Sequence, residues 1–119
     1  MGGKSSRTKG QVGEREICKI LGEALGISLE RNLEQTRDGG CDIRLRHWAI
    51  EVKRQEKLQV DKWWEQAVSQ AEKCEKHPIL IFRQSRMPWR VIMPVALTQD
   101  PRIHYMHTDL DYLIERIKS

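Results

Sequence analysis

The segment Cys41–Lys53, with the sequence CDIRLRHWAIEVK, decides how this chain is expected to fold. Apolar and polar residues alternate along it on both sides of Arg46-His47. Alternation with a period of two is typical of strands, and two such runs joined by a short turn predict an antiparallel hairpin. We therefore expect paired strands at 41–46 and 48–53.

Helical and strand patterns surround this hairpin. Apolar residues recur every three or four positions in three segments, which is the spacing of one helix face. Two short segments on either side of a turn at 85–88 are typical of strands. The predicted helices span 11–25, 60–76 and 109–118, and the predicted strands span 79–83 and 89–93. Gly26 is a natural end for the first helix, and Thr108 is expected to be the N-cap of the last.

This order of elements predicts a single α/β domain at 11–119, in which helices flank a mixed β-sheet. Residues 1–10 are rich in glycine, serine and basic side chains, and they are expected to form a flexible basic arm. No internal repeat or long linker divides the chain.

The composition favours an affinity for polyanions. The chain has 119 residues, of which 39% are hydrophobic, so it can form one modest core. Its net charge of +4 favours polyanionic partners such as nucleic acid. Its three cysteines lack the spacing of a zinc site, and we expect free thiols in a reducing compartment. The sequence shows neither a signal peptide nor an apolar run of the roughly 20 residues that a membrane span needs. We therefore expect a cytoplasmic protein without a membrane partner.

Two acidic residues and a lysine of the hairpin indicate chemistry. Glu51 and Lys53 are two positions apart on one strand, so their side chains leave the same face. A turn at Arg46-His47 would place Asp42 opposite Glu51, with the Cβ atoms about 5 Å apart. Two carboxylates at that distance repel each other unless a cation lies between them, and oxygen ligands with open positions suit Mg²⁺. With an ammonium group beside the metal, the three residues suit phosphodiester hydrolysis, and the alternative is an ordinary solvated sheet face.

Glu14 adds a third carboxylate from the first helix. On a helical wheel Glu14 lies about 50° from the centre of the apolar face, and Glu16 lies about twice as far away. An acid so near a core-facing stripe is costly unless a cation meets it. A metal held by Asp42 and Glu51 is one such cation, and the positive end of the helix dipole is the alternative. The geometry favours Glu14 over Glu16, which would either support the site or pair with a nearby base.

Three short segments resemble, in order and spacing, the archaeal-type Holliday junction resolvases of the PD-(D/E)XK nuclease superfamily. The segments are KGQVGEREI at 9–17, GCDI at 40–43 and AIEVK at 49–53. The resemblance covers about residues 7–95, and three motifs in register are far more specific than one. It implies a restriction-endonuclease-like core with the order helix, strand, strand, helix, strand, strand, helix. Relatives encoded by phages exist in this family, so a phage origin and action in the host cytoplasm are compatible with it.

The resemblance also implies roles for individual residues. Glu14, Asp42 and Glu51 would be metal ligands, for Mg²⁺ with Mn²⁺ as a substitute, and Lys53 would be the catalytic lysine. The residues expected to contact DNA are Lys9, Arg15, Arg31, Thr36, Arg37 and Arg54. Family members are homodimers that cut opposing strands of a four-way junction, and a two-fold enzyme matches a two-fold junction. We therefore expect branched DNA and a second copy of the chain as partners, and no small-molecule cofactor.

Two other functions fit the same motifs. A PD-(D/E)XK nuclease that acts on flaps or on other branched or duplex DNA would carry the same residues, because they serve hydrolysis rather than substrate shape. A non-catalytic DNA-binding module would keep the fold, although an inactive relative usually loses a ligand or the lysine. The adjacent Trp63 and Trp64 depart from the family pattern and are expected to pack in a core or an interface.

Overall fold

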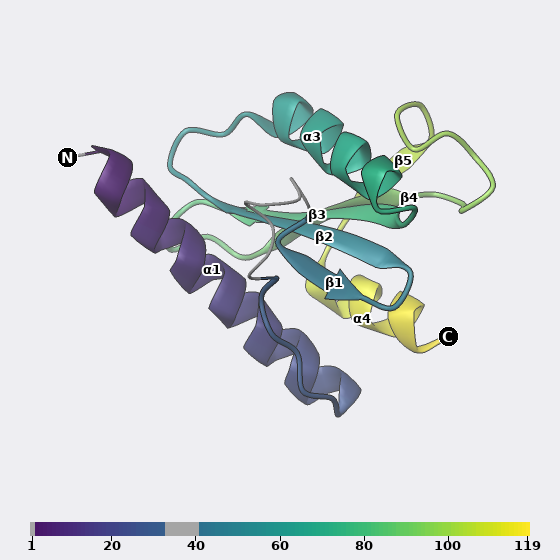
Figure 1. The fold of residues 1–119 in the computed structure, drawn as a ribbon, viewed down its shortest axis with the longest axis horizontal. Coiled ribbons are helices and arrows are strands. Elements are labelled where there is room, and N and C mark those ends of the chain that lie inside the picture. The colour runs from purple at the N-terminus through teal and green to yellow at the C-terminus, as the bar shows by residue number, and fades with distance from the viewer. Residues whose placement is uncertain (1, 33–40) are drawn as a thin grey trace.

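The computed structural model describes residues 2–32 and 41–119, and of residues 2–9 the backbone alone (Figure 1). Its helices are α1 (Gly2–Leu25), α3 (Val60–Lys73) and α4 (Leu110–Lys118). Its strands are β1 (Ile43–Leu45), β2 (Trp48–Arg54), β3 (His77–Arg83), β4 (Arg90–Pro94) and β5 (Tyr105–Thr108). They form a five-stranded sheet in the order β1-β2-β3-β4-β5, in which β2 and β3 are parallel and the other neighbours are antiparallel. The predicted α/β fold, with a mixed sheet flanked by helices, is confirmed.

The hairpin of β1 and β2 has the register expected from the sequence. Ile43 lies opposite Ile50, as a turn at residues 46 and 47 requires. Arg46 occupies that turn with a φ of 55°, a left-handed conformation that residues other than glycine seldom adopt. Continued by one residue, this register sets Asp42 against Glu51 at the open end of β1.

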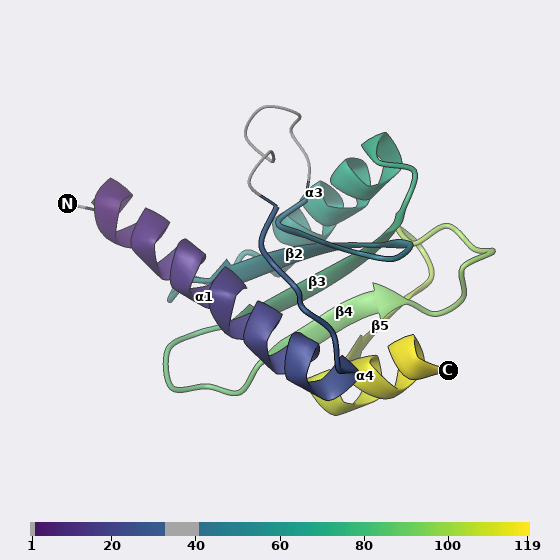
Figure 2. The ribbon, with the colours of Figure 1, turned by 60° about the horizontal axis from the view of Figure 1, so that its bottom comes forward.

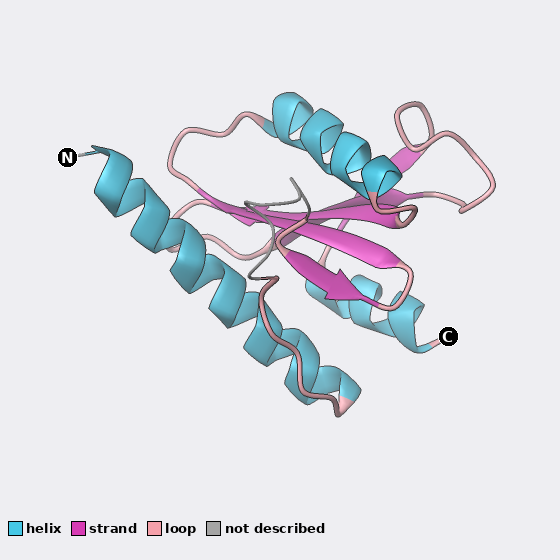
Figure 3. Cartoon of the chain, in the orientation of Figure 1, coloured by secondary structure: helices cyan, strands magenta, loops and turns pink. Residues whose placement is uncertain are grey.

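Helices cover both faces of the sheet, with α3 on one side and α1 and α4 on the other (Figure 3). The alternation of β2 divides its side chains between these layers. Ile50 and Val52 belong to a core cluster that includes Ile17 of α1 and Leu113 of α4. The cluster beneath α3 consists of Trp63, Trp64, Ala67, Val68, Leu80, Phe82 and Ile92. The prediction that the two adjacent tryptophans pack in a core is confirmed.

The helix α1 crosses the sheet obliquely and ends where the sequence predicts (Figure 2). Gly26 has a φ of 68°, and the Ile27 N–H donates a hydrogen bond to the Gly22 carbonyl at 3.0 Å, which closes the last turn. The helix begins at Gly2 and so includes residues 2–10, and the flexibility expected of that segment stays a prediction. None of the helices in the described part of the chain has the length and apolar character that crossing a membrane requires.

The C-terminal half departs from the prediction at one strand and one cap. The strand β5 was not predicted, because its four residues alternate between exposed and half-buried positions and carry little apolar signal. The predicted N-cap of α4, Thr108, instead pairs with Val91 as the last residue of β5. Asp109 is the N-cap, and its side chain accepts a hydrogen bond from the Tyr112 N–H at 2.8 Å.

The cysteines are free thiols, as expected. Cys18 and Cys41 are buried, and burial is the main cause that raises the pKa of each thiol to about 11. A thiol with so high a pKa is protonated at neutral pH and is a poor nucleophile. Neither residue is therefore a candidate for covalent chemistry.

Candidate active site

Asp42, which is half-buried, and Glu51, which is buried, form a carboxyl pair where β1 begins. The Asp42 carboxylate accepts a hydrogen bond at its Oδ2 atom from the Val52 N–H at 2.8 Å, which holds it against β2. Glu51 is only 7% exposed. Burial is the main cause that raises the pKa of both carboxyl groups above their ordinary values, and the Asp42 charge raises the pKa of Glu51 further. Two carboxyl groups that disfavour each other's charge form a site that favours a proton or a cation.

Lys53 and Glu14 complete the group that the sequence predicts. Lys53 follows Glu51 on the same face of β2, and its positive charge opposes the rise in pKa of both carboxyl groups. Glu14 comes from α1, is 8% exposed, and adds its negative charge to the causes that raise those two pKa values. Charges affect each other's pKa strongly only over short distances. The structure therefore brings Glu14 of α1 and Asp42 close to Glu51 and Lys53 of β2.

Glu14 is held by Arg31. The Arg31 Nε atom donates a hydrogen bond to the Glu14 Oε2 atom at 2.7 Å, and both side chains are largely buried. The segment that carries Arg31 is tied to the hairpin, since the Asn32 N–H donates to the Asp42 carbonyl at 2.7 Å and the Asn32 amide donates to the Cys41 carbonyl at 3.0 Å. The positive charge that pairs with Glu14 in this structure is therefore that of Arg31, a residue that the family resemblance assigns to DNA contact.

The donor set of Asp42 and Glu51 suits a hard divalent cation. Both side chains supply carboxylate oxygens, which Mg²⁺ prefers. Burial first, and then the negative charge of neighbouring carboxylates, raises the pKa of both groups, and a bound cation would offset both effects. Within the described residues, no three Asp, Glu, His or Cys side chains form a group that could hold a metal ion. Mg²⁺ usually keeps several water ligands and accepts phosphate oxygens, so two protein carboxylates can be enough to hold it. Coordination by Glu14 stays a prediction.

A polar cavity of about 380 Å³ lies beside Glu51 and Lys53. Its other lining residues all come from α3, and they are Glu65, Gln66, Ser69 and Gln70. The helix lies close to β2 at this point, because the small side chains of Ala71 on α3 and Ala49 on β2 pack together with Cys41. Sequence reasoning missed this wall of the site, since amide and hydroxyl groups on one side of a helix look like an ordinary solvated surface. The signal in the sequence was that Gln66 and Gln70 are four positions apart, and so on one side of the helix, next to the buried Ala67 and Ala71.

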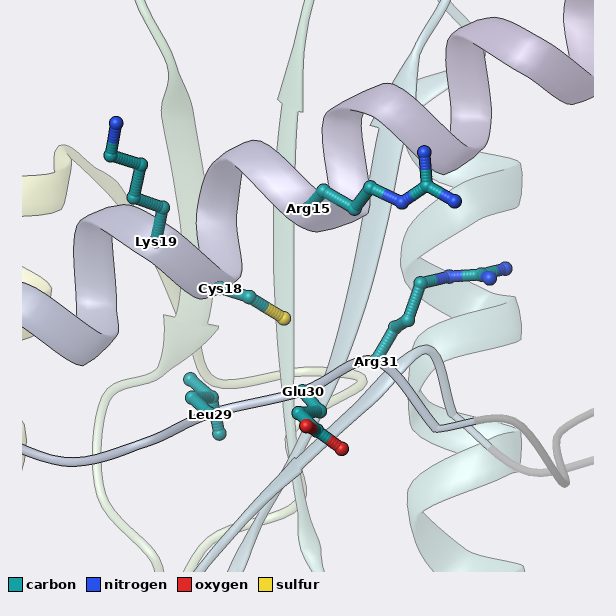
Figure 4. Close-up of a pocket in the computed structure, with 6 residues that line it drawn as sticks. All are labelled: Arg15, Cys18, Lys19, Leu29, Glu30 and Arg31. Atoms are coloured by element: carbon teal, nitrogen blue, oxygen red, sulfur yellow. The ribbon is translucent and has the colours of Figure 1, made fainter.

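A second cavity, of about 500 Å³, lies between α1 and the segment that follows it (Figure 4). Its lining residues are Arg15, Cys18, Lys19, Leu29, Glu30 and Arg31. The Arg15 and Arg31 side chains extend in the same direction, whereas Lys19 extends away from them (Figure 4). Three cations and one carboxylate make this wall positive, which suits an anion such as a phosphate.

The remaining residues expected to contact DNA differ in what the structure shows of them. Arg54, at the end of β2, is partly buried, and its Nε atom is buried without a hydrogen-bond partner among the described residues. The side chain of Lys9 is not among those described, and Thr36 and Arg37 lie outside the described residues.

Glu16 belongs to a separate cluster and pairs with a base. Its carboxylate accepts hydrogen bonds from the Arg83 Nη2 atom and from the Trp89 Nε1 atom, each at 3.0 Å. The Arg83 guanidinium lies 4.8 Å from the centroid of the Trp89 ring, a cation–π contact. These contacts join α1 to the last residue of β3 and to the residue before β4. Of Glu14 and Glu16, the one that interacts with Asp42 and Glu51 is therefore Glu14, as the helical wheel predicts.

The chain as a whole is similar to known proteins. Residues 5–118 match the model of a protein family described as "Phage putative PDDEXK endonuclease". No curated protein matches the chain. Among solved structures, the chain is similar to that of Hjc, a Holliday junction resolvase from the archaeal hyperthermophile Archaeoglobus fulgidus. The two chains are 23% identical, with a TM-score of 0.49, over 82% of this chain and 85% of that chain.

Proposed function

Because this chain belongs to the phage PD-(D/E)XK endonuclease family, we propose that it is a metal-dependent DNA endonuclease that resolves four-way junctions. Its catalytic residues in this proposal are Glu14, Asp42, Glu51 and Lys53. The observation that carries it is the carboxyl pair of half-buried Asp42 and buried Glu51, set opposite each other by the hairpin register, with Lys53 on the same face as Glu51. The preference for a four-way junction rests on the three motifs that resemble the resolvases.

Asp42 and Glu51 would hold Mg²⁺, with Mn²⁺ as a substitute, and Glu14 would be the third carboxylate. When bound, the ion supplies positive charge that stabilises the transition state and lowers the pKa of a water molecule beside it. The hydrogen bond from the Val52 N–H to the Asp42 Oδ2 atom would keep the orientation of this carboxylate fixed while it helps to hold the ion. Burial of Glu51 strengthens its interaction with a positive charge.

Lys53 would act on the phosphate. In hydrolysis the oxygen of a water molecule forms a bond to phosphorus, and the water loses a proton to solvent. The bond from phosphorus to a deoxyribose oxygen breaks, and the deoxyribose oxygen takes up a proton from solvent. Negative charge builds up on the non-bridging phosphate oxygens during this step. The Lys53 ammonium, held by β2 beside both carboxylates, would donate a hydrogen bond to one of them.

The positive wall of Arg15, Lys19 and Arg31 would bind the phosphate backbone beside the active site. Arg31 joins the two regions, since it contacts Glu14 through Nε and lines the positive cavity. A homodimer would present two active sites to the two strands that a four-way junction requires to be cut. With such a substrate the protein would act in the cytoplasm. If a phage encodes the protein, this would be the cytoplasm of the host cell.

The test uses purified protein with a labelled immobile four-way junction, a flap and a linear duplex of matched sequence. Each DNA is incubated with Mg²⁺, with Mn²⁺ and with EDTA. We expect paired, symmetric nicks confined to the junction, in the presence of either metal and not in EDTA. Light scattering of the complex would report whether two copies of the chain bind each junction.

Other outcomes separate the parts of this proposal. Equal cutting of all three DNAs would retain the nuclease and remove the junction specificity. Cutting of the flap alone would identify a different branched substrate. Binding without any cutting in either metal would favour the non-catalytic module and would contradict the proposed activity.

A further inference from the structure

The amide of Gln70 on α3 has a buried oxygen without a partner. Its Oε1 atom is buried and accepts no hydrogen bond within the described residues. Buried acceptors are nearly always paired in folded proteins, because an unpaired one forfeits its interaction with water. Because the Gln70 side chain also lines a cavity, a turn of its amide toward that cavity would give the oxygen the partner that it lacks.

The surroundings of Gln70 indicate what that partner is. Gln70 lines the cavity of about 380 Å³ that Glu51 and Lys53 also line. At about 30 Å³ for each molecule, the cavity has room for on the order of ten waters. Its walls are carboxylate, ammonium, amide and hydroxyl groups, so water is the species expected to fill it.

The helix fixes the point from which the Gln70 side chain extends. Ala71, the next residue along α3, packs on Ala49 of β2, two positions before Glu51. That contact holds Gln70 near the level of Glu51, on a rigid element and not on a loop. A hydrogen-bonding group on such an element can orient a small molecule at low cost in entropy.

We propose that the Gln70 Oε1 atom accepts a hydrogen bond from the water molecule that attacks the phosphodiester, and so orients that water toward phosphorus. This inference rests on the proposed nuclease function. Gln70 is a positioning residue in it: the amide is neutral and takes no proton, and the proton that the water loses passes to solvent. The oxygen of the same water forms the bond to phosphorus while the bond to the deoxyribose oxygen breaks, as in the hydrolysis above.

The test compares Gln70→Met, which keeps the length of the side chain and removes the acceptor, with Gln59→Met as a matched control. Gln59 precedes the first residue of the same helix, is exposed, and makes no capping hydrogen bond through its side chain. We measure kcat and KM for the junction, the flap and the duplex in Mg²⁺, DNA affinity in Ca²⁺, and the midpoint of thermal unfolding. Gln70→Met is expected to lower kcat roughly 10- to 100-fold, as for other losses of orientation, with KM, affinity and midpoint near those of the wild type.

The outcomes separate this inference from the function on which it rests. A folded Gln70→Met protein with the kcat of the wild type overturns the role of Gln70 and leaves the nuclease intact. A parallel fall in affinity or in the unfolding midpoint that accounts for the lost rate also overturns it, because the residue is then structural. If Gln70→Met does not fold, Gln70→Asn, which withdraws the amide by one methylene group, is measured in the same way with the same expectation. A wild-type protein that cuts none of the three DNAs overturns the proposed function, and this inference with it.

Discussion

The two faces of β2 bury side chains with opposite consequences. Toward α1 and α4, Ile50 and Val52 are enclosed by apolar groups, so their burial stabilises the fold. Toward α3, Glu51 is almost as deeply buried, yet burial raises its pKa and Asp42 raises it further. The alternation of one strand thus separates a face that holds the domain together from a face that carries the proposed chemistry at a cost in stability. Five substitutions test this division.

Substitution of the polar face should have the largest effect, on the rate of cleavage. Glu51→Ala and Lys53→Ala each remove a group that acts on charge in the transition state, and we expect rates to fall by on the order of 10³-fold or more. Single-turnover cleavage of the junction in Mg²⁺ measures this. Affinity for DNA in Ca²⁺ should change little, because phosphate contacts elsewhere supply most of it. Wild-type cleavage by either variant would contradict the assignment of the active site.

Substitution of the apolar face should instead affect stability. Ile50→Ala leaves a cavity in the cluster that joins the sheet to α1 and α4, and we expect the free energy of unfolding to fall by about 2–5 kcal/mol. Urea denaturation followed by tryptophan fluorescence measures the change. Under conditions in which the variant is still folded, kcat should remain near that of the wild type. A large loss of kcat in the folded variant would show that the two faces are not separable.

The pH dependence of stability should sharpen the contrast. Because burial raises the pKa of Glu51, the folded protein binds its proton more tightly than the unfolded chain does. Its contribution to stability is fully present below the ordinary carboxyl pKa and is lost as the pH rises through the raised value. In EDTA, Glu51→Gln should therefore be more stable than the wild type at pH 8, by about 1 kcal/mol or more, and the difference should shrink toward pH 4.

Denaturation of both proteins across this pH range provides the measurement. Mg²⁺ should reduce the difference at pH 8, since a bound cation would compensate the charge that Glu51 carries in the wild type. Parallel stability curves for the two proteins in EDTA would mean that Glu51 is not a strained carboxylate in the folded state.

The end of the apolar face should show the smallest effect. Arg54 follows Val52 on that face. Both residues lie close to α1, since a Cβ atom placed on Gly13 of that helix would lie 3.4 Å from the Arg54 Cβ atom and 3.6 Å from the Val52 Cγ1 atom. If Arg54 contacts a phosphate, Arg54→Ala should weaken DNA binding a few-fold and reduce the salt dependence of log K by about one. Fluorescence anisotropy at several salt concentrations measures both quantities. An unchanged salt dependence would remove Arg54 from the DNA contacts.

Local patterns predicted most of the fold and the centre of the site. The position of the turn and a period of two were enough to place Asp42 against Glu51, and the observed register is the one predicted. The helical wheel likewise separated Glu14 from Glu16. Where the prediction failed, the local signal was weak: β5 is four residues long, and the N-cap of α4 lay one residue beyond the one chosen.

The sequence by itself determined which face of each element each side chain occupies, because strand and helix periods are set by local backbone geometry. Only the tertiary structure decided which of these faces meet. The pairing of Arg31 with Glu14, the pairing of Arg83 with Glu16, and the placement of Gln70 beside Glu51 all join residues distant in the chain. Such contacts depend on how helices pack across the sheet, and that packing follows from the fit of many side chains at once, such as the close approach of Ala71 to Ala49. No local pattern of residues encodes it.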